Sequence, residues 1–229
     1  MSRPDGSVPR TIARGALAGW LVIAAVQIAV AFASRSSESR DSEGTVLYSW
    51  SFAVGSIVIY SVLVGFTFLI ATGLGEPRRA LGLVPFERRW LGRAALVVVA
   101  SAVLGRILEP VLHGGEKQGY APDAWEPRHA AAFAVNSLVT VTIVPFAEEL
   151  FFRGAGVSVL RPFGPTVAIA GTAVVFGLAH GILVALPVLV ALAAGLAWIR
   201  LRSGSVWPSI TAHAGYNGLA ILVLYLTLQ

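Results

Sequence analysis

The sequence predicts an all-α, polytopic membrane protein, a bundle of about seven transmembrane helices. Of its 229 residues, 56% are hydrophobic and 13% are charged, whereas a soluble domain has about 25% charged residues. The apolar stretches are continuous over the length of a membrane helix and do not alternate as the strands of a membrane barrel do. The chain has no cysteine, which excludes disulfides, thiolate catalysis and thiolate metal ligands.

Residues 1–130 are predicted to form an N-terminal transmembrane region of about three helices. We expect these helices over residues 15–33, 46–74 and 94–112. The first could instead be a signal peptide, but its apolar run is longer than the usual signal core and favours a retained helix. Pro77 and Pro85 interrupt the basic segment between the second and third helices, where we expect no helix.

Residues 131–229 are predicted to form a second, catalytic region of about four helices. From residue 129 the chain is almost continuously apolar, apart from one charged motif and three short turns. One helix is expected to run through the motif to residue 161, and the next from Pro165 through His180. The last two helices follow turns at 181–187 and 202–208.

The distribution of positive charge predicts a cytoplasmic N-terminus and an outside C-terminus. Membrane proteins concentrate Lys and Arg in their cytoplasmic loops. Of the 17 Lys and Arg residues, twelve fall on the N-terminal side of the predicted helices and four on the other side. The twelve are Arg3, Arg10, Arg14, Arg78, Arg79, Arg88, Arg89, Arg93, Arg153, Arg161, Arg200 and Arg202. Basic loops of this kind account for the net charge of +5, so we expect no nucleic acid partner. The high content of Arg and Ala, with a single Lys, suggests a bacterial source and a location in the cell membrane.

A charged motif at membrane depth is the strongest functional signal in the sequence. Glu148, Glu149 and Arg153 lie within an apolar stretch, where each ionisable group costs about 2.5–3.5 kcal/mol on insertion scales. Residues four apart share a helix face, so Glu149 and Arg153 are predicted to pair. Glu148 then points elsewhere and is predicted to act as the base of a hydrolase.

Two other helices carry polar side chains to the same depth. Phe176 and His180 share one helix face, and His213 and Asn217 share another. At 1.5 Å per residue, counting from the basic side places Glu148, His180 and His213 at overlapping levels of about 12–22 Å. Glycines near these residues are expected to let helices approach and to leave room for a peptide. They are Gly154, Gly156, Gly177, Gly181, Gly215 and Gly218.

These residue types support two mechanisms of amide hydrolysis. In the first, a buried glutamate deprotonates water, and His213 and Asn217 donate hydrogen bonds to the developing oxyanion. In the second, Glu148, His180 and His213 bind one divalent metal such as Zn²⁺ and leave a position open for water. The common His-Glu-x-x-His zinc sequence is absent, and the choice between metal and no metal stays open.

Together these motifs resemble the CAAX protease and bacteriocin-processing (abortive-infection) family, relatives of the Ras-converting prenyl protease. The resemblance covers about residues 131–225 and rests on Glu148-Glu149-x-x-x-Arg153, Phe176-x-x-x-His180 and His213-x-x-x-Asn217. It implies an intramembrane endopeptidase. Glu148 and His180 would activate water, His213 and Asn217 would form the oxyanion site, and Glu149, Arg153 and Phe176 would support the structure. Both metal-dependent and metal-free mechanisms are proposed for this family.

Two other functions compete with the protease hypothesis. In a catalytically inactive scaffold or protease-associated protein, these polar side chains would only hold the helices together. The pair Glu149 and Arg153 would be enough for that purpose. In a proton-coupled transporter we would expect paired broken helices in two halves of the chain, which the sequence lacks. The expected partners are the lipid bilayer and a peptide or protein substrate. A prenylated C-terminus, a bacteriocin leader and a membrane anchor all remain open as substrates.

Overall fold

A computed structural model describes residues 10–37, 43–113, 122 and 124–228 of the chain. Across these ranges the protein is all-helical and has no strand. Six helices are long and apolar enough to cross a membrane, and a shorter apolar helix accompanies them. The predicted polytopic helical bundle is therefore confirmed.

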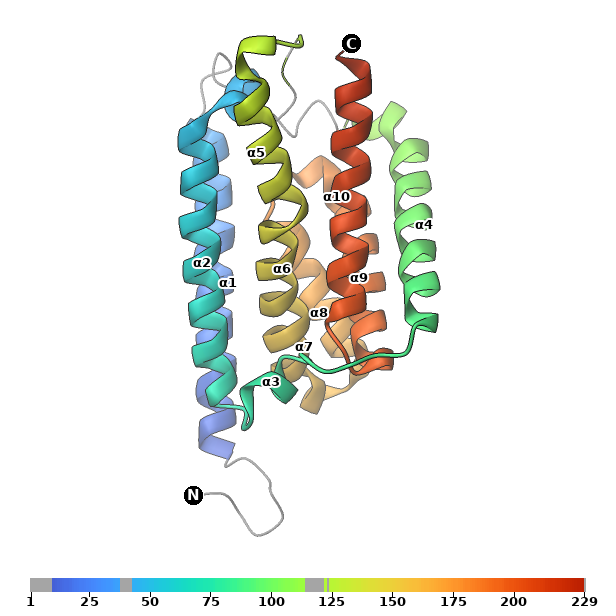
Figure 1. Cartoon of the computed structure of the whole chain (residues 1–229). Coiled ribbons are helices and arrows are strands. Elements are labelled where there is room, and N and C mark those ends of the chain that lie inside the picture. Colours follow the sequence, from blue (N-terminus) through green and yellow to red (C-terminus); the bar gives the residue numbers. More distant parts are fainter. Residues whose placement is uncertain (1–9, 38–42, 114–121, 123, 229) are drawn as a thin grey trace.

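The chain passes back and forth along the bundle, so that α1 begins and α10 ends at opposite ends (Figure 1). The first half contains α1 (Arg10–Ser37), the 3-10 helix η1 (Glu43–Tyr48), α2 (Trp50–Thr72), α3 (Pro77–Ala80) and α4 (Arg89–Leu112). The second half contains η2 (Pro127–His129), α5 (Ala130–Val141), α6 (Ile143–Glu149), the π-helix η3 (Leu150–Gly156), α7 (Val157–Leu160), η4 (Arg161–Phe163), α8 (Pro165–Leu178), η5 (Leu183–Ala185), α9 (Leu186–Ser203) and α10 (Trp207–Thr227). Helices α8 and α9 lie behind α6 and α10, and α4 packs against α9 and α10 (Figure 1).

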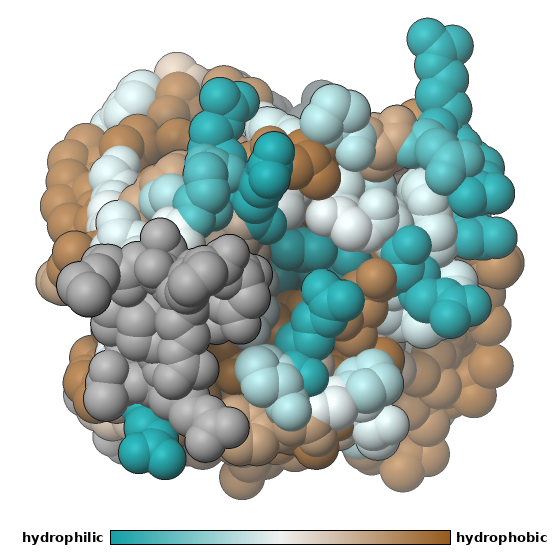
Figure 2. Space-filling model, turned by 90° about the horizontal axis from the view of Figure 1, so that it is seen from below, coloured by the Kyte–Doolittle hydropathy of each residue, from teal (hydrophilic) through white to brown (hydrophobic). Residues whose placement is uncertain are grey.

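The outer faces of the bundle are apolar and exposed. Val22 on α1, Ile59 on α2, Leu96 on α4 and Leu226 on α10 are each more than 60% exposed. Such surface is stable only in lipid or against a partner, which fits an integral membrane protein. Figure 2 shows hydrophilic side chains gathered on the end of the bundle that carries α3, with apolar side chains around its edge. This end includes the exposed Arg78, Arg79, Arg88, Arg89, Arg161 and Arg202.

The fourth predicted helix runs through the charged motif, but it is neither straight nor α-helical throughout. It bends at Thr142 (φ −118°, ψ −64°), between α5 and α6. Pro145 causes this bend because it has no N–H to donate to the carbonyl of Val141. The chain then changes to the π-helix η3 directly after Glu149, and π segments inside α-helices are frequent at functional sites.

Besides shifts of a few residues at helix ends, two features differ from the sequence predictions. Pro77 does not prevent a helix but begins one, because the first position of a helix needs no N–H. Glu76 caps α3 by accepting hydrogen bonds from the backbone N–H groups of Arg78 and Arg79. The sequence predicted that His180 lies on the same helix as Phe176. Helix α8 instead ends at Leu178, and His180 lies in the turn that follows.

The core is built around aromatic side chains and close helix contacts. The Trp20 side chain is 1% exposed, and its indole N–H donates to the carbonyl oxygen of Phe151 at 3.1 Å. Its ring fills the space beside Gly156, where an added Cβ would lie 2.8 Å from the indole. A Cβ at Gly177 would lie 2.7 Å from Leu186. These two glycines therefore serve helix packing, and the expectation that they leave room for a peptide is wrong.

Replacing Gly156 by Ala is expected to destabilise the protein by about 1–3 kcal/mol, because the added methyl group overpacks the contact with Trp20. The matched control is Gly55→Ala on α2, where nothing lies within 4 Å of the added Cβ. There the better helix propensity of Ala is expected to raise stability by up to about 1 kcal/mol. Thermal unfolding in detergent compares the two variants, and equal midpoints would contradict the packing role of Gly156.

Candidate active site

Glu148 lies at the C-terminal end of α6, and its side chain is largely buried. The residue is 8% exposed, and its Oε1 accepts a hydrogen bond from the Tyr60 hydroxyl at 2.9 Å. Its other oxygen, Oε2, is buried and has no hydrogen-bond partner among the described residues. The nearest ring nitrogen is Nε2 of His213, 3.8 Å from Oε2. That separation is too long for a direct hydrogen bond and suits a bridging oxygen.

Glu149 contacts both Arg153 and His213 in the interior of the bundle. Its Oε1 lies 2.9 Å from Nη1 of Arg153 and 2.9 Å from Nδ1 of His213. Glu149 and Arg153 are both 0% exposed, so the predicted pairing is present and fully buried. Arg153 also donates to the carbonyl oxygen of Ala193 at 3.3 Å and lies 4.4 Å from the ring centre of Phe176. This arrangement ties η3 to α8, α9 and α10.

The contact with Glu149 determines how His213 is oriented. A carboxylate that faces an arginine accepts hydrogen bonds, so Nδ1 of His213 carries the proton and donates it. Nε2 is then the nitrogen that faces Glu148. In metal-free and metal-dependent enzymes alike, such a carboxylate holds the imidazole ring in one orientation.

His180 is oriented by a backbone carbonyl. Its Nδ1 lies 2.8 Å from the oxygen of Phe176, and because a carbonyl only accepts, Nδ1 is the donor. In the neutral ring Nε2 is then an acceptor. The Phe176 ring lies between the two histidines, with centroids 4.6 Å from that of His180 and 5.6 Å from that of His213.

Asn217 is one helical turn from His213 on α10, but no contact with the acidic pair is seen. Its amide donates a hydrogen bond to the carbonyl oxygen of Thr140 at 3.0 Å, next to the bend between α5 and α6. The structure therefore brings together Glu148, Glu149, Arg153, Phe176, His180 and His213, which we call the polar cluster, and places Asn217 at its edge. The remaining two histidines lie apart from this cluster: His113 is exposed at the end of α4, and His129 stacks on Tyr48.

A divalent metal site of the kind considered for the polar cluster requires three protein ligands around one ion. Within the residues that the structure describes, no three His, Asp or Glu side chains are grouped so that they could hold one ion. Nδ1 of each histidine is engaged, His213 by Glu149 and His180 by Phe176, which leaves the two Nε2 atoms as the ring nitrogens that could bind a metal ion. As they lie, the side chains do not form a three-ligand zinc site.

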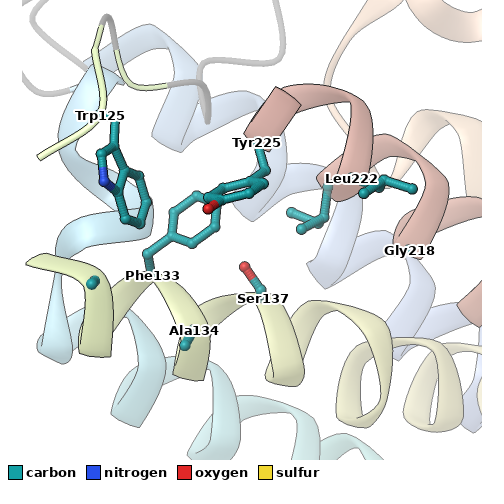
Figure 3. A pocket seen from close by; sticks show the side chains of 9 residues that line it. Trp125, Phe133, Ala134, Ser137, Gly218, Leu222 and Tyr225 are labelled. Atoms are coloured by element: carbon teal, nitrogen blue, oxygen red, sulfur yellow. The ribbon is translucent and has the colours of Figure 1, made fainter. Parts of the chain in front are cut away.

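An apolar groove lies between α5 and α10. Its cavity volume is about 390 Å³, and its walls include Trp125, Phe133, Ser137, Gly218 and Tyr225. Figure 3 shows the rings of Trp125, Phe133 and Tyr225 at one end of the groove, with Ser137 facing Tyr225. Gly218 follows Asn217 in the chain, so the groove begins close to the hydrogen bond between Asn217 and Thr140. None of the residues of the polar cluster lines it.

Sequence reasoning missed Tyr60, the hydrogen-bond partner of Glu148. The signal was present, because Tyr60 is the only tyrosine in α2 and lies twelve residues from Thr72, its last residue. At 1.5 Å per residue that is about 18 Å, within the range of depths estimated for the motif residues. Tyr60 lies outside the three motifs, and helical spacing does not indicate that α2 packs against α6.

Buried carboxylates and two oriented imidazoles within a helical membrane bundle are groups that a hydrolase could use. Residues 130–219 match the model of the family described as type II CAAX prenyl endopeptidase Rce1-like. This part of the chain is therefore similar to the CAAX protease family of membrane endopeptidases, which is the family that its three motifs resemble. No curated protein and no solved structure matches the chain.

Proposed function

We propose that this protein hydrolyses a peptide bond within or at the membrane, with Glu148 as the base that activates water. The observation that carries this proposal is the pair formed by Glu148 Oε2, buried and without a partner among the described residues, and His213 Nε2 at 3.8 Å. A reacting oxygen fits between a carboxylate that can take its proton and a ring nitrogen that can hydrogen-bond to it. The CAAX endopeptidase family assigned to residues 130–219 supports the same reaction class.

In the proposed mechanism each member of the polar cluster has one task. Glu148 removes a proton from water and returns it to the departing amine, while Nε2 of His180 accepts a hydrogen bond from the water. His213 donates to the oxyanion from Nε2 when both of its ring nitrogens carry a proton. Glu149 and Arg153 hold His213 in place, and Asn217 supplies the second donor once substrate engages the edge of the cluster.

We propose that the substrate is a membrane-associated or prenylated-type peptide. The apolar outer surface keeps the bundle in lipid, and the polar cluster is buried among its helices. A substrate must therefore carry enough apolar surface to enter the membrane. The basic end of the bundle favours a cytoplasmic N-terminus in a bacterial cell membrane.

His213→Ala is expected to lower kcat for peptide cleavage by about 10²–10³-fold, with a much smaller change in KM. Removal of an oxyanion donor has an effect of this size, because the interaction is made in the transition state. His129→Ala is the control, since His129 stacks on Tyr48 away from the polar cluster and its loss should leave kcat unchanged. Rates are measured with purified protein and a fluorogenic peptide, and an unchanged kcat in His213→Ala would remove the oxyanion role.

Metal analysis of the active protein, followed by treatment with a chelator, tests the water mechanism directly. Because the polar cluster does not fit three metal ligands, the proposed mechanism requires cleavage to continue at the parent rate after chelation. Loss of activity on chelation, with recovery on adding Zn²⁺, would replace the glutamate mechanism by a metal-dependent one.

A further inference from the structure

We propose that Tyr60 is a positioning residue for the reaction, so that α2 completes an active site whose other members all come from residues 130–219. This proposal rests on the proposed role of Glu148 as the base. Tyr60 lies outside the segment that matches the endopeptidase family. Helix α2 then contributes to catalysis as well as to the packing of the bundle.

The contact between Tyr60 and Glu148 is direct. The Tyr60 hydroxyl lies 2.9 Å from Oε1 of Glu148, and a carboxylate oxygen accepts, so the phenol donates. Helix α2 packs along α6 and η3, the two segments on either side of the junction between Glu149 and Leu150 (Figure 1). Tyr60 itself packs against the main hydrophobic core and is half-buried. A hydrogen bond to a charged group in such surroundings is among the stronger ones.

Tyr60 acts by selecting which oxygen of Glu148 faces the reaction. With Oε1 bound to the hydroxyl, Oε2 is the oxygen left without a partner among the described residues and directed toward His213. A glutamate side chain otherwise has considerable rotamer freedom, and its terminal torsion is broad. The hydrogen bond from Tyr60 therefore holds the carboxylate in the orientation in which Oε2 can take a proton.

Tyr60→Phe removes only the hydroxyl oxygen and keeps the ring in its place. We expect kcat for peptide cleavage to fall about tenfold or more, which is the effect of losing a hydrogen bond to a charged group. KM should change less than about twofold, because substrate binding does not use this contact. The matched control is Tyr48→Phe, which removes a hydroxyl that donates to the Ala124 carbonyl oxygen at 2.9 Å, away from the polar cluster. Tyr48→Phe should leave kcat unchanged.

Incorporating 4-aminophenylalanine in place of Tyr60 tests whether a different hydrogen-bond donor restores the kcat that is lost in Tyr60→Phe. Its amine places an N–H donor where the hydroxyl was, so kcat should recover most of the loss seen in Tyr60→Phe. A parent-like kcat in Tyr60→Phe, a change confined to KM, or no recovery with the amine would overturn the positioning role. Assaying Glu148→Gln alongside separates the two proposals. If Glu148→Gln is inactive while Tyr60→Phe keeps its kcat, only the role of Tyr60 falls, and if Glu148→Gln stays active, both fall.

Discussion

Glu148→Gln is expected to remove nearly all peptide cleavage, with a loss of about 10²–10⁴-fold in kcat, while the protein stays folded. Glutamine has nearly the shape of glutamate, and its amide oxygen can still accept the hydrogen bond from Tyr60. It cannot take a proton from water, and general base catalysis contributes about 10²–10⁴-fold. Purified protein in detergent is assayed with a membrane peptide, and size-exclusion chromatography and thermal unfolding establish the folded fraction.

The control for this variant is Glu126→Gln. The Glu126 side chain is about 40% exposed and pairs with Arg128 at 2.6 Å, at the start of η2 and away from the polar cluster. Neutralising it removes the same charge from the chain without touching the proposed base, so the cleavage rate should match that of the parent. Cleavage by Glu148→Gln at the parent rate would show that another group activates the water.

Arg153→Leu is expected to produce the largest loss of stability. It leaves the Glu149 carboxylate fully buried with His213 as its remaining partner. Breaking a buried ion pair from one side costs about 3–5 kcal/mol, because the remaining charge is not compensated. For a chain of this size that corresponds to a thermal midpoint lower by about 6–20 °C. Differential scanning fluorimetry in detergent measures this change.

The matched comparison is Arg89→Leu at the surface. Arg89 pairs with Glu87 at 2.7 Å, but both side chains are more than 60% exposed. Exposed pairs contribute about 0–1 kcal/mol, so the midpoint should move by no more than about 4 °C. If Arg153→Leu and Arg89→Leu shift the midpoint equally, Glu149 is not the buried charge that the contacts with Arg153 and His213 indicate.

Several parts of the fold and site followed from simple rules applied to the sequence. Continuous apolar runs predicted the helices because backbone groups in lipid must be paired within a segment. The four-residue spacing predicted the contact between Glu149 and Arg153, which the structure places at 2.9 Å. Counting depth from the basic side predicted that His213 meets Glu148. These rules depend on position along one helix, which a sequence states directly.

Other features of the fold and the site depend on contacts between different helices, which the spacing of residues along one helix does not predict. The π-helix η3 directly follows Glu149, and no residue type in Leu150–Gly156 demands it. Gly156 was expected to leave space, but the Trp20 side chain from α1 fills that space. Tyr60 reaches Glu148 only because α2 packs along α6. In each case the deciding neighbour lies on another helix, far away in the sequence.

The shortness of α8 also affects the lipid that surrounds the protein. Its 14 residues rise about 21 Å, whereas the hydrocarbon layer is about 30 Å thick. The turn at His180 therefore ends about 9 Å short of the far surface. The His180 carbonyl oxygen accepts a hydrogen bond from Arg35, a charged residue near the end of α1. A bilayer accommodates such a mismatch by thinning or by admitting solvent around the polar groups. We expect water to approach the buried carboxylates most closely beside the end of α8, where Arg35 and the turn at His180 lie.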